Sequence, residues 1–283
     1  MAIDMNQENH LSLNTPLQQI VIFGTRGFGR EVHQLIKDLA AAGTRVACAG
    51  FLVEQTYREQ SLIHDLPVFG DADWLAGASN VCVMMAIGAT APRRRIADYI
   101  ERKFGQRFLL LQHPRAWVGD NIQIGLGSIV CAGALVTTDI TVGRFVQLHV
   151  GCTIGHDTVI GDFVTIAPGA NVSGRVVIGE GTFVGAGAVI LPDIKIGTWA
   201  TIGAGAVVTR HVADNVTVVG SPAKVISQQT PGWQLANAQR SDTARVRASD
   251  LRNPATVPGP SCLYGGPGRN MGAGMAYQQR PVA

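Results

Sequence analysis

The sequence predicts two structural parts, an α/β domain followed by a parallel β-helix. Segments with strand and helix character alternate over the first third of the chain. From Val118 to Val208 every sixth residue is Val, Ile or Leu, and the next residue is often glycine. Glycine accounts for 34 of 283 residues, without the three-residue period of collagen. The alternation predicts the first part, and the six-residue period with its glycines predicts the second.

The α/β domain is expected over residues 18–112. QQIVIFG is predicted as a buried strand, TRGFGR as a glycine-rich turn, and EVHQLIKDLAAAG as a helix that stops at Gly43. There follow a strand, RVACAGFLV, a polar excursion containing LPVFGDADWL, a third strand, VCVMMAIG, and a helix, APRRRIADYIERKFG. Strands that alternate with helices favour a small parallel sheet of Rossmann type.

The β-helix is expected over residues 113–226. In such a helix each short strand supplies one inward apolar side chain, and the small residue after it lets the backbone turn a corner. Three strands make one coil of eighteen residues, so the repeat predicts about five to six coils. Residues eighteen apart then stack at a spacing of roughly 4.8 Å.

The two ends of the chain are predicted to lie outside these parts. Residues 1–17 form a polar leader without a signal-peptide pattern, and no stretch reaches about 18 apolar residues. Residues 227–283 are rich in Gln, Arg, Pro and Gly, a composition typical of disorder. We therefore expect a soluble cytoplasmic protein with no membrane partner.

Composition also excludes several classes of function. The net charge of +3 is spread thinly, with no run of basic residues, so no nucleic-acid partner is expected. The five cysteines are scattered and form no CxxC motif, which favours reduced thiols over disulfides or a zinc site.

The segment HVGCTIGHDTVIGDF contains the candidate catalytic residues. His149 and His156 fall at or near corners of the repeat and are expected to lie together. Asp157 is a carboxylate that can raise the basicity of His156. Gly174 lies eighteen residues after His156, so its N–H is available as an oxyanion donor beside a general base. A zinc site of the carbonic anhydrase type needs three converging histidines, so no metal is expected.

The glycine-rich turn is a candidate binding site for a diphosphate. Its glycines fall at 24, 27 and 29, which is not the dinucleotide fingerprint, yet N–H groups at a helix start suit a diphosphate. A redox dinucleotide and a purely structural turn remain alternatives. The run Arg93–Arg95 is expected to be a solvated helix start, from which Arg93 reaches a phosphate.

The glycine-rich α/β domain, the hexapeptide repeat, TIGHDTVIGDF in mid-helix and GSPAKVI at its end together resemble a known enzyme family. This is the NeuD/PglD-type family of sugar O-/N-acyltransferases, within which the chain is similar to N-acetyltransferases of the bacillosamine and perosamine type. The resemblance covers residues 18–226 and implies a left-handed β-helix, acetyl-CoA as acyl donor, and a homotrimer with active sites between subunits.

The resemblance also implies roles for individual residues. His156 matches the general base, Asp157 its acidic neighbour, and Gly174 the glycine whose amide meets the acetyl carbonyl. The coenzyme A positions correspond to Thr165, Gly174, Ala186 and Ala204. The positions that contact the sugar nucleotide correspond to Gly24, Thr25, Arg26, Gly27, Val53, Glu54, Gly88, Arg93 and His149.

Three departures from the family pattern concern the acceptor. Val53 and Glu54 replace the usual acidic pair, Ala89 and Thr90 follow the strand-end glycine, and His149 stands where the bacillosamine branch has Asn. These changes leave open which nucleotide and which sugar are used, and the pathway, for example polysaccharide biosynthesis.

The sequence therefore predicts an acetyl-CoA-dependent N-acetyltransferase acting on a nucleotide-linked amino-deoxysugar, UDP- or GDP-linked, by direct transfer. One alternative is O-acetylation of sialic acid or another sugar. An alternative of a different class is a non-catalytic trimeric scaffold that binds sugar nucleotides.

Overall fold

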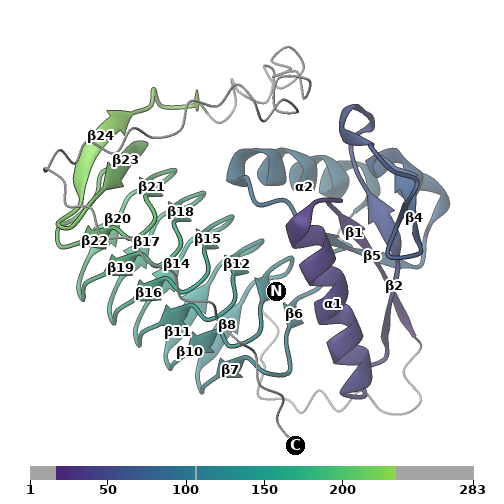
Figure 1. Ribbon diagram of the computed structural model, residues 1–283, viewed down its shortest axis with the longest axis horizontal. Helices are drawn as coiled ribbons and strands as arrows, with labels where there is room; N and C mark the ends of the chain where they lie inside the picture. The colour runs from purple at the N-terminus through teal and green to yellow at the C-terminus, as the bar shows by residue number, and fades with distance from the viewer. Residues whose placement is uncertain (1–16, 106, 234–283) are drawn as a thin grey trace, which may run out of the picture. The chain divides into compact units, whose positions relative to one another are not determined.

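The computed structural model describes residues 17–105 and 107–233. Most of the predicted leader and the part of the predicted tail from residue 234 onward lie outside the described residues. The described chain confirms the predicted fold class: an α/β domain comes first, and a parallel β-helix follows it (Figure 1).

The α/β domain is built on a sheet of five strands in the order β3-β4-β2-β1-β5. Only the short β3 runs antiparallel to its neighbour. Its elements are β1 Gln18–Phe23, α1 Gly27–Ala41, β2 Val46–Leu52, η1 Gln55–Tyr57, β3 Leu62–Ile63, β4 Leu66–Gly70, η2 Ala72–Gly77, β5 Val81–Met85 and α2 Thr90–Phe104.

The two helices cover opposite faces of this sheet. Ile20 and Ile22 of β1 pack with α1, whereas Val21 and Phe23, which point the other way, pack with α2. Every β1 residue from Ile20 onward is buried, as expected for a central parallel strand covered on both sides.

The β-helix has three parallel sheets, which we call faces 1, 2 and 3. Face 1 contains β6 Leu111–Gln112, β9 Ile129–Val130, β12 Gln147–Leu148, β15 Thr165–Ile166, β18 Phe183–Val184, β21 Thr201–Ile202, β23 Val216–Val219 and the antiparallel β24 Lys224–Gln228. Face 2 contains β7 Trp117–Val118, β10 Leu135–Val136, β13 Thr153–Ile154, β16 Asn171–Val172, β19 Val189–Ile190 and β22 Val207–Val208. Face 3 contains β8 Ile122–Ile124, β11 Ile140–Val142, β14 Val159–Ile160, β17 Val177–Ile178 and β20 Lys195–Ile196.

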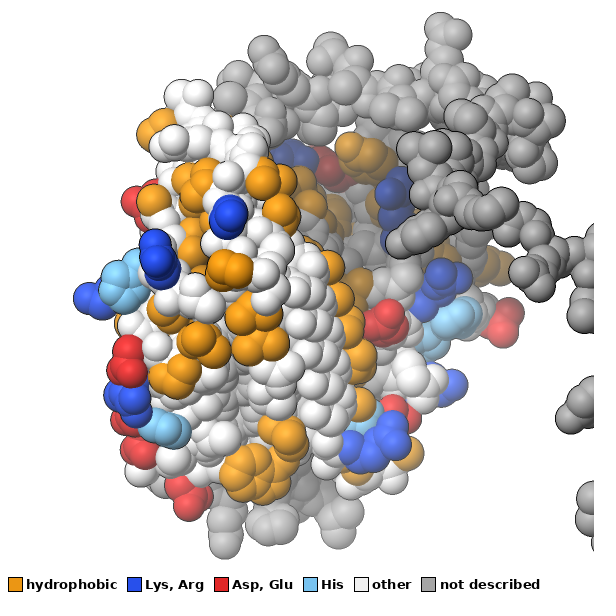
Figure 2. Space-filling model, turned by 60° about the vertical axis from the view of Figure 1, so that its left-hand side comes forward, with side chains coloured by type: hydrophobic (Ala, Val, Ile, Leu, Met, Phe, Trp, Pro, Cys, Tyr) orange, Lys and Arg blue, Asp and Glu red, His pale blue; other side chains and the backbone are white. Residues whose placement is uncertain are grey.

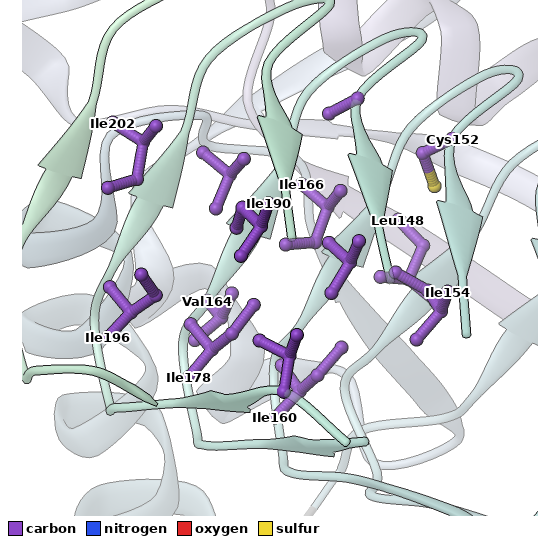
Figure 3. Packing of buried hydrophobic residues seen from close by; sticks show 14 of the residues in the cluster. Leu148, Cys152, Ile154, Ile160, Val164, Ile166, Ile178, Ile190, Ile196 and Ile202 are labelled. Atoms are coloured by element: carbon purple, nitrogen blue, oxygen red, sulfur yellow. The ribbon is translucent and has the colours of Figure 1, made fainter. Parts of the chain in front are cut away.

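The predicted eighteen-residue coil is present in the strand register. Leu135 pairs with Thr153 on face 2, and Val159 pairs with Val177 on face 3. The repeated aliphatic residues point inward, as Ile154, Ile160 and Ile166 do from the three faces of one coil (Figure 3). Residues eighteen apart stack in columns, as Ile160, Ile178 and Ile196 do on face 3. The last coil is shorter, because Thr201 pairs with Thr217.

The structure differs from the sequence expectations in three local places. The helix α1 begins at Gly27, within the predicted turn, rather than at Glu31. The polar excursion contains two strands, β3 and β4, of which the two-residue β3 forms the edge of the sheet and β4 pairs with β2. The strand β24 runs to Gln228, two residues into the predicted tail, because it pairs with β23.

The α/β domain packs on face 1 of the β-helix. Gln147 of β12 donates hydrogen bonds to the carbonyls of Met85 (2.9 Å) and Ile87 (3.2 Å) at the end of β5. His113 Nε2 lies 2.9 Å from Asp38 Oδ2 of α1. The positions of the three faces relative to this domain therefore determine which candidate residues can meet.

Candidate active site

His156 and Asp157 lie on the edge where faces 2 and 3 meet, in the turn between β13 and β14. His156 Nδ1 is 2.6 Å from Asp157 Oδ2. Asp157 adopts a left-handed backbone conformation (φ 58°), and this turn carries both side chains outward. Since the carboxylate contacts Nδ1, it favours the tautomer with the proton on that nitrogen. Nε2 is then the nitrogen that can accept a proton.

The imidazole of His156 lies against Gly174, one coil further along the same edge. A Cβ built on Gly174 would be 2.6 Å from His156 Nε2, closer than a side chain can approach. The ring therefore occupies its position because residue 174 has no side chain. This arrangement brings His156 and Gly174 together, as the eighteen-residue spacing predicted.

The glycine-rich turn at the start of α1 borders a pocket in the α/β domain. The pocket is lined by Thr25, Arg26, Val53, Tyr57, Glu59, Gln60 and Ile63. Sequence reasoning did not single out Tyr57, Glu59 or Gln60, because they lie in the polar excursion, where no pattern indicated their direction. Glu54 lies next to Val53, and its carboxylate is paired with Arg95 (2.8 Å).

His149 lies on a different edge, where faces 1 and 2 meet, and contacts the glycine-rich turn. Its ring centroid is 4.4 Å from that of Phe28 in the first turn of α1. Burial, and then the charge of Arg93, lower the pKa of His149 to about 4. The imidazole is therefore neutral at pH 7, and it offers hydrogen bonds without carrying a positive charge.

This shifted pKa makes the free energy of unfolding depend on pH. The unfolded chain's imidazole titrates near about 6.5, so between that pH and about 4 the unfolded state binds more protons. We expect the wild-type protein to lose about 2 kcal/mol of stability from this group between pH 7.5 and pH 5. Urea denaturation at both pH values should show a smaller loss for His149→Asn. A residual loss is expected from His33, whose pKa is also lowered, first by burial. Equal losses in the two proteins would contradict the assignment.

Arg93 does not lie on a solvated helix face, and this expectation is corrected. Its side chain is fully buried (0% exposed) between α2 and face 1. It donates to the carbonyls of Ile87 (2.9 Å) and Phe163 (2.6 Å) and to the Thr165 hydroxyl (2.9 Å). Desolvation lowers its pKa to about 9, and the chain's own oxygen atoms, rather than a phosphate, surround its charge.

The other two arginines of this run are partly exposed and form ion pairs. Arg94 pairs with Glu180 of the β-helix, and Arg95 pairs with Glu54. The prediction of a solvated helix start is therefore correct for Arg94 and Arg95 and wrong for Arg93.

Apart from Gly174, the residues predicted to bind coenzyme A lie away from His156. Thr165 is buried on face 1, where Arg93 donates to it. Ala186 and Ala204 are exposed at the same edge as His149, in the turns that follow β18 and β21. Gly88 is exposed at the end of β5.

The candidate residues thus form two groups in one chain, and the expected proximity of His149 and His156 is corrected. The two histidines are seven residues apart, which is more than the six residues of one side of the coil. They therefore lie on successive edges. The edge that carries His156 lies opposite face 1, on which the α/β domain packs. One chain therefore presents the candidate catalytic edge, which carries His156, and the candidate acceptor-binding region, beside the glycine-rich turn, on opposite sides of its β-helix.

The described residues contain neither a candidate membrane span nor a candidate metal site. Within residues 17–105 and 107–233, no helix is long and apolar enough to cross a membrane. In the same part of the chain, no group of three or more His, Cys, Asp or Glu side chains is placed to hold a metal ion.

Two family models match the chain. Residues 19–100 match the PglD N-terminal domain, and residues 175–210 match the bacterial transferase hexapeptide repeat. No curated protein matches the chain significantly.

Several solved structures are similar over the α/β domain and the β-helix together. The acetyltransferase domain of PglB from Neisseria gonorrhoeae is 30% identical with a TM-score of 0.66, over 74% of this chain and 100% of that one. WeeI from Acinetobacter baumannii is 31% identical with a TM-score of 0.67, over 74% and 100%. A histidine variant of perosamine N-acetyltransferase from Caulobacter crescentus, in complex with CoA and GDP-perosamine, is 28% identical with a TM-score of 0.67, over 75% and 98%.

These matches span almost the whole length of each relative, and two of them reach 30% identity or more. They agree with the two family models on both structural parts of the chain. The chain belongs to the NeuD/PglD-type family of sugar N-acetyltransferases.

Proposed function

We propose that this enzyme transfers the acetyl group of acetyl-CoA to the amino group of a nucleotide-linked amino-deoxysugar, such as a UDP- or GDP-linked 4-amino sugar. The observation that carries the proposal is the His156–Asp157 pair, with a 2.6 Å contact at Nδ1 and Nε2 held over Gly174. A neutral imidazole oriented by a carboxylate is a general base, and direct acyl transfer to an amine needs one.

In the proposed reaction the amine nitrogen attacks the thioester carbonyl carbon and forms the C–N bond. His156 Nε2 takes the proton that the amine loses, and Asp157 stabilises the resulting imidazolium. The oxyanion collapses, the C–S bond breaks, and the thiolate of coenzyme A takes the proton back from Nε2. The base is thereby regenerated without a covalent enzyme intermediate.

The other site residues have supporting roles in this proposal. The Gly174 N–H is the donor for the oxyanion, and the exposed Ala186 and Ala204 mark the path of coenzyme A. Thr165 is not assigned to the coenzyme, because it is buried and its hydroxyl accepts a hydrogen bond from Arg93. The pocket beside Thr25 and Arg26 suits the nucleotide, with its diphosphate over Gly24–Gly27 at the start of α1. The neutral His149 lies beside this turn and is assigned to the sugar. Gly88, which follows β5, the strand next to β1, is assigned to the sugar as well.

We further propose that each active site combines two chains of a homotrimer. The support is the placement of the catalytic edge and the acceptor-binding region on opposite sides of one β-helix. Faces 2 and 3, which flank the catalytic edge, also expose apolar side chains: Trp117, Leu135, Val159 and Val177. Figure 2 shows such side chains gathered on the surface of the β-helix. Burying them between copies is favourable.

A complementation experiment tests the shared site. The variants His156→Ala and Arg26→Glu each disable one half, so each alone is expected to be nearly inactive. Oligomers that contain both variants, made by coexpression with two affinity tags, should regain activity. In these oligomers an intact edge from one chain meets an intact pocket from its neighbour. Mixed oligomers as inactive as the parents would show that each site belongs to one chain.

The reaction itself is tested by mass spectrometry. The wild-type protein is incubated with acetyl-CoA and a panel of UDP-, GDP- and dTDP-linked amino sugars, together with free sialic acid. A gain of one acetyl mass on one nucleotide amino sugar, absent with His156→Ala, is the expected result. Acetylation of sialic acid alone would favour O-acetyl transfer, and no transfer to any acceptor would favour the scaffold.

A further inference from the structure

A ladder of polar residues runs along the edge that carries His156. Asn121, Asp139, Asp157, Arg175 and Asp193 occupy the same corner position in successive coils. All five have the left-handed backbone conformation, with φ between 56° and 63°. Figure 2 shows acidic, basic and histidine side chains gathered along one edge of the β-helix. Each member of this ladder therefore has its neighbours one coil before and one coil after.

Arg175 lies between two carboxylates of the ladder but binds only one of them. Its Nε is 2.6 Å from Asp193 Oδ1, and its Nη2 is 2.9 Å from Asp193 Oδ2. This is the two-pronged geometry in which a guanidinium binds a carboxylate most strongly. The Asp157 carboxylate on the other side contacts His156 instead.

The pKa shifts of Arg175 and Asp193 are consistent with this pairing. The pKa of Arg175 is raised mainly by the hydrogen bonds that it donates to Asp193 and, less strongly, by the charge of Asp157. The pKa of Asp193 is lowered mainly by Arg175 and, among weaker causes, by His156. Asp139, one coil before Asp157, accepts hydrogen bonds from Asn121 (3.1 Å) and Thr138 (2.9 Å).

The carboxylate of Asp157 cannot serve the imidazole and a guanidinium equally well. If Arg175 bound Asp157, its positive charge would oppose protonation of His156, and its donors would compete for the oxygen that Nδ1–H uses. Arg175 is one coil from Asp157, and its two hydrogen bonds to Asp193 direct it away from Asp157. Asp193 thus acts on the imidazole through two intermediate residues.

We propose that Asp193 is a positioning residue for acetyl transfer: by holding Arg175, it keeps the Asp157 carboxylate available to His156. This inference rests on the proposed role of His156 as the base. Asp193 touches neither substrate nor reacting atoms. Its effect is on the orientation and basicity of the imidazole.

The test compares three variants in the full-length enzyme. In Asp193→Asn, Arg175 is released and turns to Asp157, so His156 becomes a weaker base. We expect kcat to fall about threefold to tenfold and the acid limb of the kcat/KM profile to move to lower pH by about half a unit or more. In the double variant Arg175→Gln/Asp193→Asn no guanidinium remains to compete, and both properties should return to wild-type values.

Asp139→Asn is the matched control, because it removes the same charge one coil from Asp157, whereas Asp193 is two coils away. If the loss of a nearby negative charge were the whole effect, Asp139→Asn would lower kcat more than Asp193→Asn. The proposed mechanism makes Asp193→Asn the more harmful one. An unshifted acid limb in Asp193→Asn, or a double variant as impaired as the single one, would overturn the proposal.

A second readout keeps this test separate from the proposed function. The ¹⁵N chemical shifts of the His156 ring report directly which nitrogen carries the proton. We expect a protonated Nδ1 in the wild-type protein and a loss of this preference in Asp193→Asn. If the wild-type protein transfers no acetyl group, the proposed function fails. The ring shifts still decide whether Asp193 controls the imidazole, and unchanged shifts in Asp193→Asn would refute it.

Discussion

Replacement of His156 by alanine is expected to lower kcat by about 10²–10⁴ while leaving coenzyme binding intact. The variant lacks the group that takes the amine proton, and no described side chain other than Asp157 makes a hydrogen bond with the imidazole. The ring is exposed at an edge outside the apolar core, so its removal should not disturb the coils. Steady-state kinetics and calorimetric titration with coenzyme A measure the two effects separately.

His211→Ala is the control for this prediction. His211 is an exposed histidine on the same edge, where its Nδ1 accepts a hydrogen bond from the Lys195 N–H (3.0 Å). We expect this variant to retain nearly full activity. Near-normal turnover by His156→Ala would remove His156 from the mechanism, and equal losses in both variants would indicate a general effect of this edge.

The Arg93→Met variant is expected to lose about 2–4 kcal/mol of unfolding free energy. Methionine fills much of the same volume but donates no hydrogen bonds. The carbonyls of Ile87 and Phe163 and the Thr165 hydroxyl would each lose the donor that Arg93 supplies. Because Arg93 is fully buried, few water molecules can replace these bonds. Urea denaturation followed by tryptophan fluorescence measures the loss.

Arg94→Met is the matched control in the next residue of α2. The Arg94 side chain is 35% exposed and pairs with Glu180 at the surface, so its removal should cost less than about 1 kcal/mol. Arg93→Lys supplies a second comparison, since it keeps the charge but cannot reach all three oxygen atoms at once. A denaturation midpoint for Arg93→Met equal to that of Arg94→Met would contradict the argument.

The architecture could be predicted from the sequence because its signals are local and repeated. A single misplaced residue would have interrupted the six-residue period between Val118 and Val208, and none does. The same period contained information that the sequence interpretation missed. Counting eighteen residues per coil places His149 and His156 on different edges, and it places Arg175 next to both Asp157 and Asp193.

The junction between the two parts could not be predicted in the same way. Arg93 and Thr165 are 72 residues apart, and no periodic pattern connects them. An arginine in a run of three at a helix start is usually solvated, and burial here depends on where the α/β domain packs on face 1. The pocket residues Tyr57, Glu59 and Gln60 were missed for a related reason. An irregular segment has no repeating pattern from which the direction of each side chain can be predicted.

If each active site is shared between two chains of a homotrimer, as proposed, the opposite placement of the two candidate regions determines how a damaged chain acts among normal ones. In a shared-site trimer each chain serves two sites, one through its edge and one through its pocket. A chain that carries both defects, His156→Ala together with Arg26→Glu, would silence two of the three sites when it joins two normal chains, and all three sites when the trimer contains more than one such chain. A gene for such a chain would therefore act dominantly over a normal copy, whereas a chain that fails to fold would be recessive.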